Sequence, residues 1–296
     1  MPFRETAHLH PLSIRSLQRC ALFAGSLLFI LFSSTAVQAQ DNFISRWQAR
    51  ATATLAQQPK WPPPVVSNYP QLIQVVRADF FRTISPTHVT TWNYGDGRGI
   101  NLIPLANTEI DIFYPPYMQH SNGTVDGFGD LGFSGKYRFL SRPEGKGSYV
   151  VSAFINATVP TGDHKNGAAH PTIAPNVGAG KGFGKFNVTS CFGATIPTEQ
   201  ADTLGRSIAW NTNAQYHLAK QAWVEIEDNA TWFNGGPNDG KKQNFVTPGA
   251  LAGPFKFYPN DPKRREGFTF GAAIQIATSS FHANNHNANF TARYTF

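Results

Sequence analysis

The chain ends in Phe290-Thr-Ala-Arg-Tyr-Thr-Phe296, and this stretch decides the fold. Its alternate positions are apolar (Phe290, Ala292, Tyr294, Phe296) and polar (Asn289, Thr291, Arg293, Thr295). Because successive side chains of a strand point to opposite faces, the pattern predicts a strand with one apolar and one polar face. Such a strand fits between lipid and a watery interior, and it also fits the edge of a soluble sandwich.

The composition favours strands and turns over helices. The 296 residues include 26 Gly, 21 Pro and 24 Phe, and only 15% are charged. Beyond the N-terminus no apolar run reaches the roughly 18 residues that a membrane helix needs. The formal net charge is +7, or +5 without residues 1–39, and it is mild and evenly spread, which argues against a nucleic-acid partner. Cys191 is the only cysteine after residue 39, so the mature chain has no intrachain disulfide.

The N-terminus has the pattern of a secretory signal. Three arginines precede the apolar run Ala21–Phe32, and small residues follow as far as Ala39. We predict a signal peptide over residues 1–39 that is cleaved after Ala39, and hence a protein of the bacterial envelope. The alternative, an N-terminal anchor helix, is disfavoured because the apolar run is too short to span a bilayer.

Residues 40–70 differ from the rest of the mature chain. Apolar residues at helical spacing predict a short amphipathic helix near residues 42–58. Pro59 and the run Pro62-Pro-Pro64 then end the helix and predict an extended connector. This helical and proline-rich arm either projects into the periplasm or lies in the mouth of the domain that follows.

Residues 71–296 alternate strand-like runs with turn clusters. The runs are 71–83, 88–103, 107–115, 128–140, 148–160, 171–182, 186–197, 205–218, 221–234, 243–257, 267–279 and 287–296. They suit the roughly 9–11 residues of a bilayer-spanning strand better than the roughly 5–6 of a soluble one. Short and long connections alternate, as in outer-membrane proteins. Closure leaves no unpaired edge in lipid. We therefore predict an all-β, transmembrane, antiparallel up-and-down barrel of about 12 strands.

Charged residues at alternate strand positions are candidates for the barrel interior. By parity they are Glu109, Asp111, Asp130, Lys136, Arg138, Glu225, Glu227 and Arg293. A charge that faced lipid at the midplane would cost up to about 4 kcal/mol, so these side chains are expected to point inward. They either form a salt-bridged filling that maintains the barrel or line a polar constriction that selects solutes.

The sequence gives weak support for catalysis or metal binding. His217 is predicted to face inward, but no serine is placed beside it and no Gly-x-Ser-x-Gly motif occurs. His282 and His286 lie in a segment with turn residues, which favours a solvated loop over a metal site. We predict no enzyme activity, no catalytic residue, no cofactor and no metal, and an outer-membrane acyl hydrolase is the least favoured alternative.

Several short motifs resemble a known family. Phe128-Gly-Asp-Leu131, Gly135-Lys-Tyr-Arg-Phe139, Val159-Pro-Thr-Gly162, Thr247-Pro-Gly249 and Glu225 are similar to the putative MetA-pathway of phenol degradation family. The resemblance covers roughly residues 70–296. It implies an outer-membrane barrel that passes aromatic or other hydrophobic compounds, and it supplies no catalytic residues.

These inferences predict a Gram-negative outer-membrane channel or transporter for passive passage of small solutes, aromatic and hydrophobic ones included. A closed binding or structural barrel is the alternative. The expected partners are outer-membrane lipid, the solute, and the barrel-assembly machinery, which would recognise the C-terminal Phe296.

Overall fold

A computed structural model describes residues 43–95, 98–261 and 264–296. The predicted signal peptide, residues 1–39, lies outside the described residues. The chain divides into two compact units, residues 1–46 and 47–296. Of the first unit only residues 43–46 are described, as the first turn of helix α2 (Phe43–Leu55). None of the helices in the described part of the chain has the length and apolarity to cross a bilayer.

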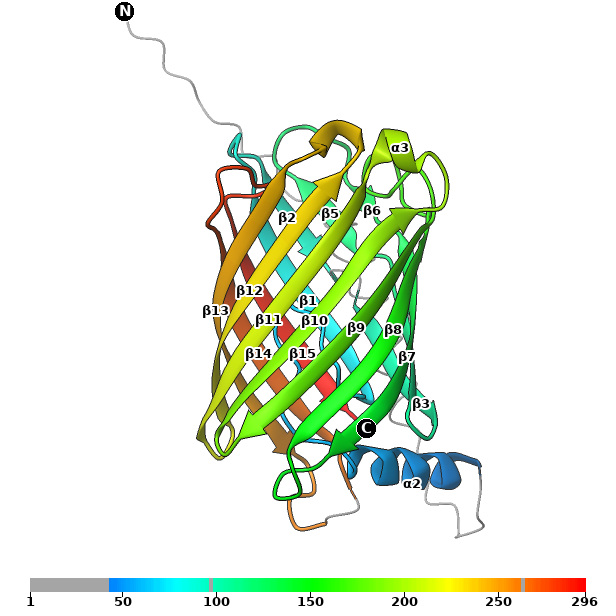
Figure 1. The fold of residues 1–296 in the computed structure, drawn as a ribbon, viewed down its shortest axis with the longest axis vertical. Helices are drawn as coiled ribbons and strands as arrows, with labels where there is room; N and C mark the ends of the chain where they lie inside the picture. Colours follow the sequence, from blue (N-terminus) through cyan, green and yellow to red (C-terminus); the bar gives the residue numbers. More distant parts are fainter. Residues whose placement is uncertain (1–42, 96–97, 262–263) are drawn as a thin grey trace, which may run out of the picture. The chain divides into compact units, whose positions relative to one another are not determined.

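The second unit is one antiparallel sheet closed into a barrel (Figure 1). Closure is made by the first and last strands, which pair from Val75 with Thr295 to Ile84 with His286. The strands are β1 (Val75–Ile84), β2 (Thr90–Tyr94), β3 (Gly99–Leu105), β4 (Thr108–Phe113), β5 (Tyr117–His120), β6 (Gly127–Phe128), β7 (Leu131–Arg142), β8 (Tyr149–Val159), β9 (Thr172–Phe183), β10 (Phe186–Pro197), β11 (Arg206–Ala219), β12 (Ala222–Asn234), β13 (Lys242–Lys256), β14 (Gly267–Ala277) and β15 (His286–Thr295). Two long connections carry α3 (Ala201–Leu204) and the 3-10 turn η1 (Gly236–Asn238).

The wall has 12 strand positions, which confirms the predicted number. Three of these positions are each made of two strands separated by a break. These pairs are β2 with β3, which both pair with β1, β4 with β5, and β6 with β7. The predicted run 88–103 is therefore two strands separated by a break. The predicted run 71–83 begins too early, since β1 starts at Val75 and residues 71–74 lie inside the barrel.

Tyr114 fills the break between β2 and β3. Its hydroxyl donates a hydrogen bond of 2.7 Å to the carbonyl oxygen of Arg77 on β1. A Cβ atom added at Gly99 would lie 3.0 Å from the Tyr114 ring and 2.0 Å from the carbonyl oxygen of Ile112. Glycine is therefore required at position 99 for β3, β4 and the tyrosine to approach one another.

The alternation read from the C-terminal stretch is present in the barrel. On β15 the polar residues Asn289 and Arg293 are 0% and 2% exposed, whereas Phe290 is 56% exposed. Aromatic side chains cluster near the strand ends on the outer surface, as Trp92 with Tyr94 and Phe268 with Tyr294. This arrangement is typical of a barrel with an apolar outer band and a polar interior.

Several charged residues of the strands face outward, in contrast to the eight that parity assigns to the interior. Arg82 and Lys181 face outward near strand ends, where Arg82 lies over the Trp92 ring and Lys181 donates to the Gly147 carbonyl. Asp228 faces outward from the middle of β12 and is exposed, although its neighbours Glu227 and Asn229 are buried. Arg82, Lys181 and Asp228 are not among the eight residues predicted for the interior.

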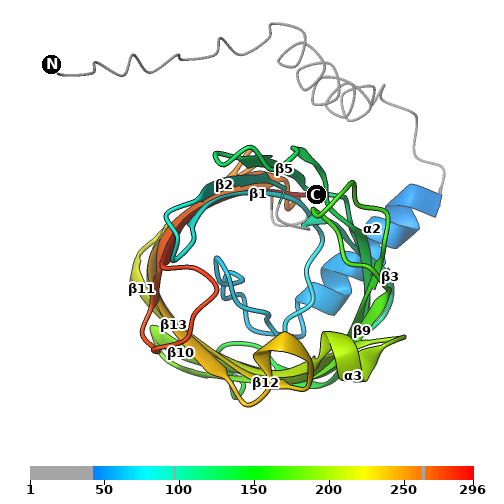
Figure 2. The same ribbon diagram turned by 90° about the horizontal axis from the view of Figure 1, so that it is seen from above.

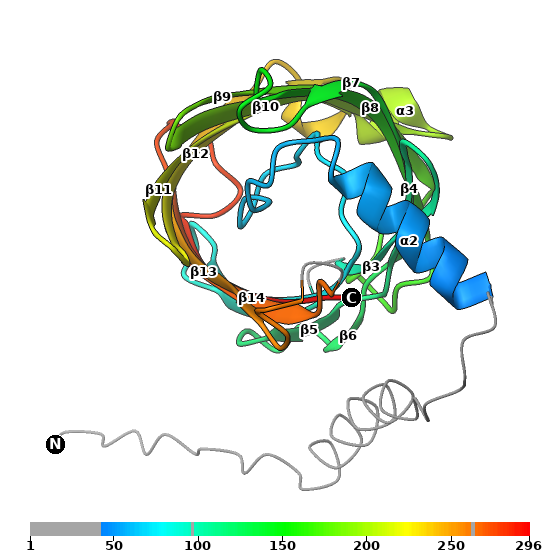
Figure 3. The same ribbon diagram turned by 90° about the horizontal axis from the view of Figure 1, so that it is seen from below.

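Residues 56–74, called the inner segment below, pass through the barrel interior (Figures 2 and 3). In helix α2, which precedes the segment, Trp47 Nε1 donates to the carbonyl oxygen of Ile103 at 2.7 Å. The Trp47 ring also meets the Phe296 ring edge-on, with 6.2 Å between the ring centres. Val65 and Leu72 of the segment are fully buried. The sequence left open whether this arm projects into the periplasm or lies in the mouth of the barrel, and in the structure residues 56–74 extend into the barrel interior.

Candidate functional site: the barrel interior and its inner segment

The proline run of the inner segment is bound through its carbonyl groups. Proline has no N–H, so this stretch offers only hydrogen-bond acceptors. Arg293 on β15 donates to the carbonyl oxygens of Pro63 and Pro64, the latter at 2.7 Å. Gln215 on β11 donates to the carbonyl oxygen of Pro62 at 3.0 Å. The wall thus supplies donors where the segment has acceptors alone.

The next three residues have N–H groups, and there the wall supplies carboxylates. Val65 N–H donates to Glu225 at 3.0 Å. Val66 and Ser67 donate to the two oxygens of Glu227 at 2.9 and 2.5 Å. Both glutamates lie two residues apart on the inner face of β12, so consecutive peptide groups meet consecutive carboxylates.

A basic cluster on β1 and beside β3 completes the contacts to this part of the segment. Arg77 donates to the Val65 carbonyl and forms a 2.7 Å ion pair with Asp79. Arg98 donates to the Val66 carbonyl at 2.8 Å. Sequence reasoning missed Arg77 and Asp79 because the predicted run 71–83 combined part of the inner segment with a strand. It missed Arg98 because the run 88–103 was taken as one strand, whereas Arg98 lies just before β3. Starting the parity at Val75 would have assigned Arg77 and Asp79 to the inner face.

Glu109 and Lys136 hold the last part of the segment. Glu109 accepts from the N–H of Ile73 and pairs with Lys136 at 2.8 Å. Lys136 also donates to the Gln71 carbonyl at 3.1 Å and lies 4.1 Å from the centre of the Tyr69 ring. Buried charges destabilise unless they are paired, and here each has a partner.

Arg138 binds the end of helix α2 and the start of the inner segment. It donates to the carbonyl oxygen of Thr54 at 2.9 Å, to Gln58 at 2.8 Å and to Asn107 at 2.6 Å. Carbonyl groups in the last turn of a helix have no partner within the helix, and a cation is favoured there. The arginine therefore holds the chain where it enters the barrel.

Six of the eight predicted interior residues thus contact the inner segment or the helix that precedes it. Asp111 lies beside them and accepts from Asn101 at 2.6 Å. Asp130 lies apart, because its two oxygens accept from the N–H groups of Gly162 at 2.9 Å and Ala168 at 2.7 Å in a long connection. Asp130 therefore holds the connection between β8 and β9 and does not contact the inner segment.

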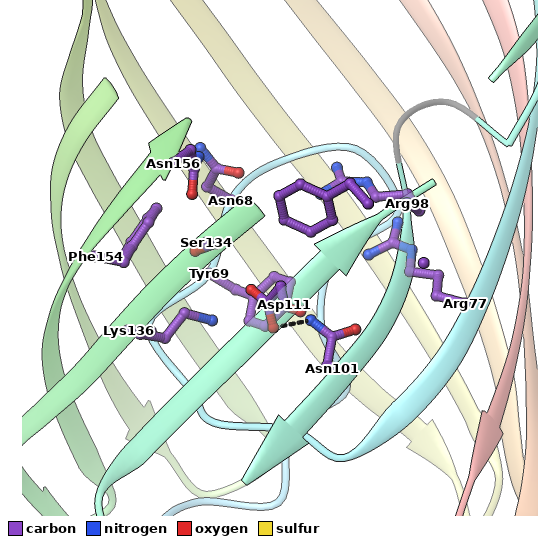
Figure 4. Close-up of a pocket in the computed structure, with 12 residues that line it drawn as sticks. Asn68, Tyr69, Arg77, Arg98, Asn101, Asp111, Ser134, Lys136, Phe154 and Asn156 are labelled. Carbon is purple, nitrogen blue, oxygen red and sulfur yellow. Dashed lines mark hydrogen bonds between the residues drawn. The ribbon is translucent and has the colours of Figure 1, made fainter. Parts of the chain in front are cut away.

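A small recess remains between the inner segment and the wall (Figure 4). Its lining residues are Asn68, Tyr69, Arg77, Arg98, Gly99, Asn101, Asp111, Phe113, Ser134, Lys136, Phe154 and Asn156. Its volume is about 60 Å³. A cavity that takes up benzene has about 150 Å³. The recess therefore accommodates a few water molecules, and an aromatic solute would need the segment to move.

Two comparisons place this barrel among known proteins. The sequence matches the family described as "Putative MetA-pathway of phenol degradation" over residues 71–252. The chain belongs to this family. The resemblance seen in the sequence motifs is therefore confirmed. No curated protein sequence matches the chain.

Two solved structures are similar to this chain. The COG4313 outer membrane channel from Pseudomonas putida F1 matches with a TM-score of 0.54 and 14% identity, over 80% of this chain and 100% of that chain. The NanC porin matches with a TM-score of 0.49 and 10% identity, over 75% of this chain and 98% of that one. At such low identity the first likeness shows the fold, that of an outer-membrane β-barrel.

His217, the candidate residue of the hydrolase alternative, lies on β11 next to Trp223 of β12. The imidazole stacks on the Trp223 ring at 4.1 Å and 7°. Within the described residues its buried Nε2 atom has no hydrogen-bond partner. His282 is bound in its loop to the Ser279 carbonyl and to Asn285, and no group of metal-binding side chains is found in the described part of the chain.

Proposed function

We propose that this family member is an outer-membrane channel for passive passage of small solutes, and that its inner segment controls the passage. The observation that carries the proposal is the set of wall charges bound to the backbone of the segment. The wall is closed by its own ladder, and the segment contributes no strand to it. Displacement of the segment would therefore leave the barrel intact and open its interior.

The solutes we propose are small compounds, aromatic ones included. When the segment is displaced, the rings of Phe113 and Phe154 remain on the wall among amide and charged groups. Aromatic rings can stack a planar solute, while the polar groups orient it. No energy coupling is needed, since flux would follow the concentration gradient.

Planar-bilayer recording of the purified chain tests the proposal. Ser67 and Asn229 are hydrogen-bonded side chain to side chain at 2.8 Å. The double substitution Ser67→Cys and Asn229→Cys, made with Cys191→Ala, would therefore tether the segment under oxidation. We expect a low conductance in the tethered state and a several-fold rise after reduction. Deletion of residues 59–74 should give the high value permanently. Equal conductance in all three forms would refute control by the segment.

A closed structural barrel is the second candidate. It is favoured by the pairing of Glu109, Glu227 and Arg293 with the segment, which leaves these charges no part in solute binding while the segment is docked. The same recordings decide. If the deletion variant folds but conducts no ions and passes no small aromatic compound into liposomes, the barrel is structural and the channel proposal is wrong.

A further inference from the structure

The outer surface of the barrel has a recess of about 470 Å³ that the proposed channel does not use. Its lining residues are Trp210, Thr212, Asp228, Ala230, Trp232, Lys242, Gln243, Asn244 and Ser279. They come from β11, β12, β13 and the connection after β14. On β12 the lining residues alternate with the buried Glu227 and Asn229, so the recess opens on the surface that faces lipid in a membrane barrel.

The deep end of the recess is polar. Asp228 pairs in register with Thr212 on β11, and Thr212 pairs with Ser190 on β10. The hydroxyls of Ser190 and Thr212 lie 3.2 Å apart, and Asn244 donates to Asp228 at 2.8 Å. Among the described residues no cation forms an ion pair with this carboxylate. A carboxylate at this depth needs further hydrogen-bond donors.

The shallow end of the recess is basic and aromatic. Lys242 pairs in register with Trp232, and Asp228 lies four residues away along β12. At about 3.3 Å per residue and a tilt near 40°, the carboxylate is roughly 10 Å deeper in the membrane than Lys242. The indoles of Trp210 and Trp232 flank the recess and are 53% and 38% exposed. From the rim inward, the order is therefore cation, aromatic rings, acceptor.

We propose that this recess binds an anionic membrane lipid at the junction of its head group and acyl chains. The proposal rests on the placement of the barrel in a membrane. A phosphate at the rim would meet Lys242, hydroxyl or amide N–H groups below it would donate to Asp228, and the acyl chains would continue along the apolar wall.

Two other occupants fit the recess less well. A zwitterionic lipid whose ammonium lies outside its phosphate has the reverse order of charges. A twofold partner in the same membrane would have its own Asp228 at the same depth, so that two carboxylates without a counter-cation would face each other. The lipid that fits carries phosphate at its surface and hydroxyl or amide donors where its chains begin.

Native mass spectrometry of the purified full chain with defined lipids tests the proposal. The probes are lipid A, which has phosphates and amide- and hydroxyl-bearing chains, and phosphatidylglycerol, which has a phosphate without such donors at the chain junction. We expect lipid A to be retained preferentially. Lys242→Gln should lower the retention of both lipids about tenfold, whereas Asp228→Asn and Asp228→Leu should lower that of lipid A alone.

The matched control is Lys256→Gln, which removes the same charge from the opposite end of β13 and should change neither retention. Equal retention by all variants, equal retention of the two lipids by the wild-type chain, or a dimer mass that Asp228→Leu abolishes would overturn the proposal. Heat-modifiable migration on gels shows that each variant is folded. Ion conductance is measured separately, so failure here leaves the channel proposal untouched.

Discussion

The substitution Glu227→Gln should loosen the inner segment without altering the barrel. Glu227 is fully buried, and its two oxygens accept from the N–H groups of Val66 at 2.9 Å and Ser67 at 2.5 Å. Glutamine keeps one acceptor and sets an NH₂ donor against the other N–H. The loss is one charge-assisted hydrogen bond, about 1.5–3 kcal/mol. At about 1.4 kcal/mol per factor of ten, the undocked fraction should rise roughly 10- to 150-fold.

Amide hydrogen exchange measures this change directly. Exchange at Val66 and Ser67 should accelerate by the same factor, since it follows the population of the undocked segment. The matched control is Glu199→Gln in an exposed loop, where the carboxylate is 69% exposed and exchange at the segment should stay unchanged. If Glu227→Gln folds and exchange at the two amides stays at the wild-type rate, the reasoning that wall carboxylates hold the segment is refuted.

Three further predictions concern the wall. Tyr114→Phe should lower the free energy of unfolding by about 1 kcal/mol, because the carbonyl of Arg77 loses its donor, and urea titration of the folded fraction measures this. Gly99→Ala should abolish folding in detergent, because the added Cβ would overlap the carbonyl oxygen of Ile112, and wild-type migration on gels would contradict this. Deletion of Phe296 should reduce the amount of folded protein in outer-membrane fractions, while refolding of the purified chain in detergent should persist. An equal loss in both settings would argue against recognition by the assembly machinery.

The barrel could be predicted because its pattern is local. Strand parity is fixed by neighbouring residues, so Lys136 and Arg138 could be assigned to the inner face from residues 128–140 alone. Closure of the sheet into a barrel could then be predicted, because an open sheet would leave unpaired backbone N–H and C=O groups at its edges in lipid. The outward orientation of Asp228 was not predicted. The sequence shows which residues share a face of a strand, but it does not show which charged residues the outer face can accommodate.

The inner segment could not be placed from the sequence for the opposite reason. Its contacts join residues far apart in the chain, as Val65 with Glu225 and Pro64 with Arg293. Its backbone follows no regular ladder, so no periodicity marks it. One signal was present: the proline run offers only carbonyl groups, and a buried run of this kind requires donors from elsewhere.

The segment also helps to fix the register of the wall. A shift of β12 by one residue would turn Glu225 and Glu227 toward lipid and bring Val224 and Ile226 against the segment. Each carboxylate would then exchange its N–H donors for hydrocarbon, and the backbone of the segment would lose its acceptors. The strand register observed for β12 is therefore the one in which its glutamates can bind the segment. Wall and segment therefore specify each other, although the segment forms no part of the sheet.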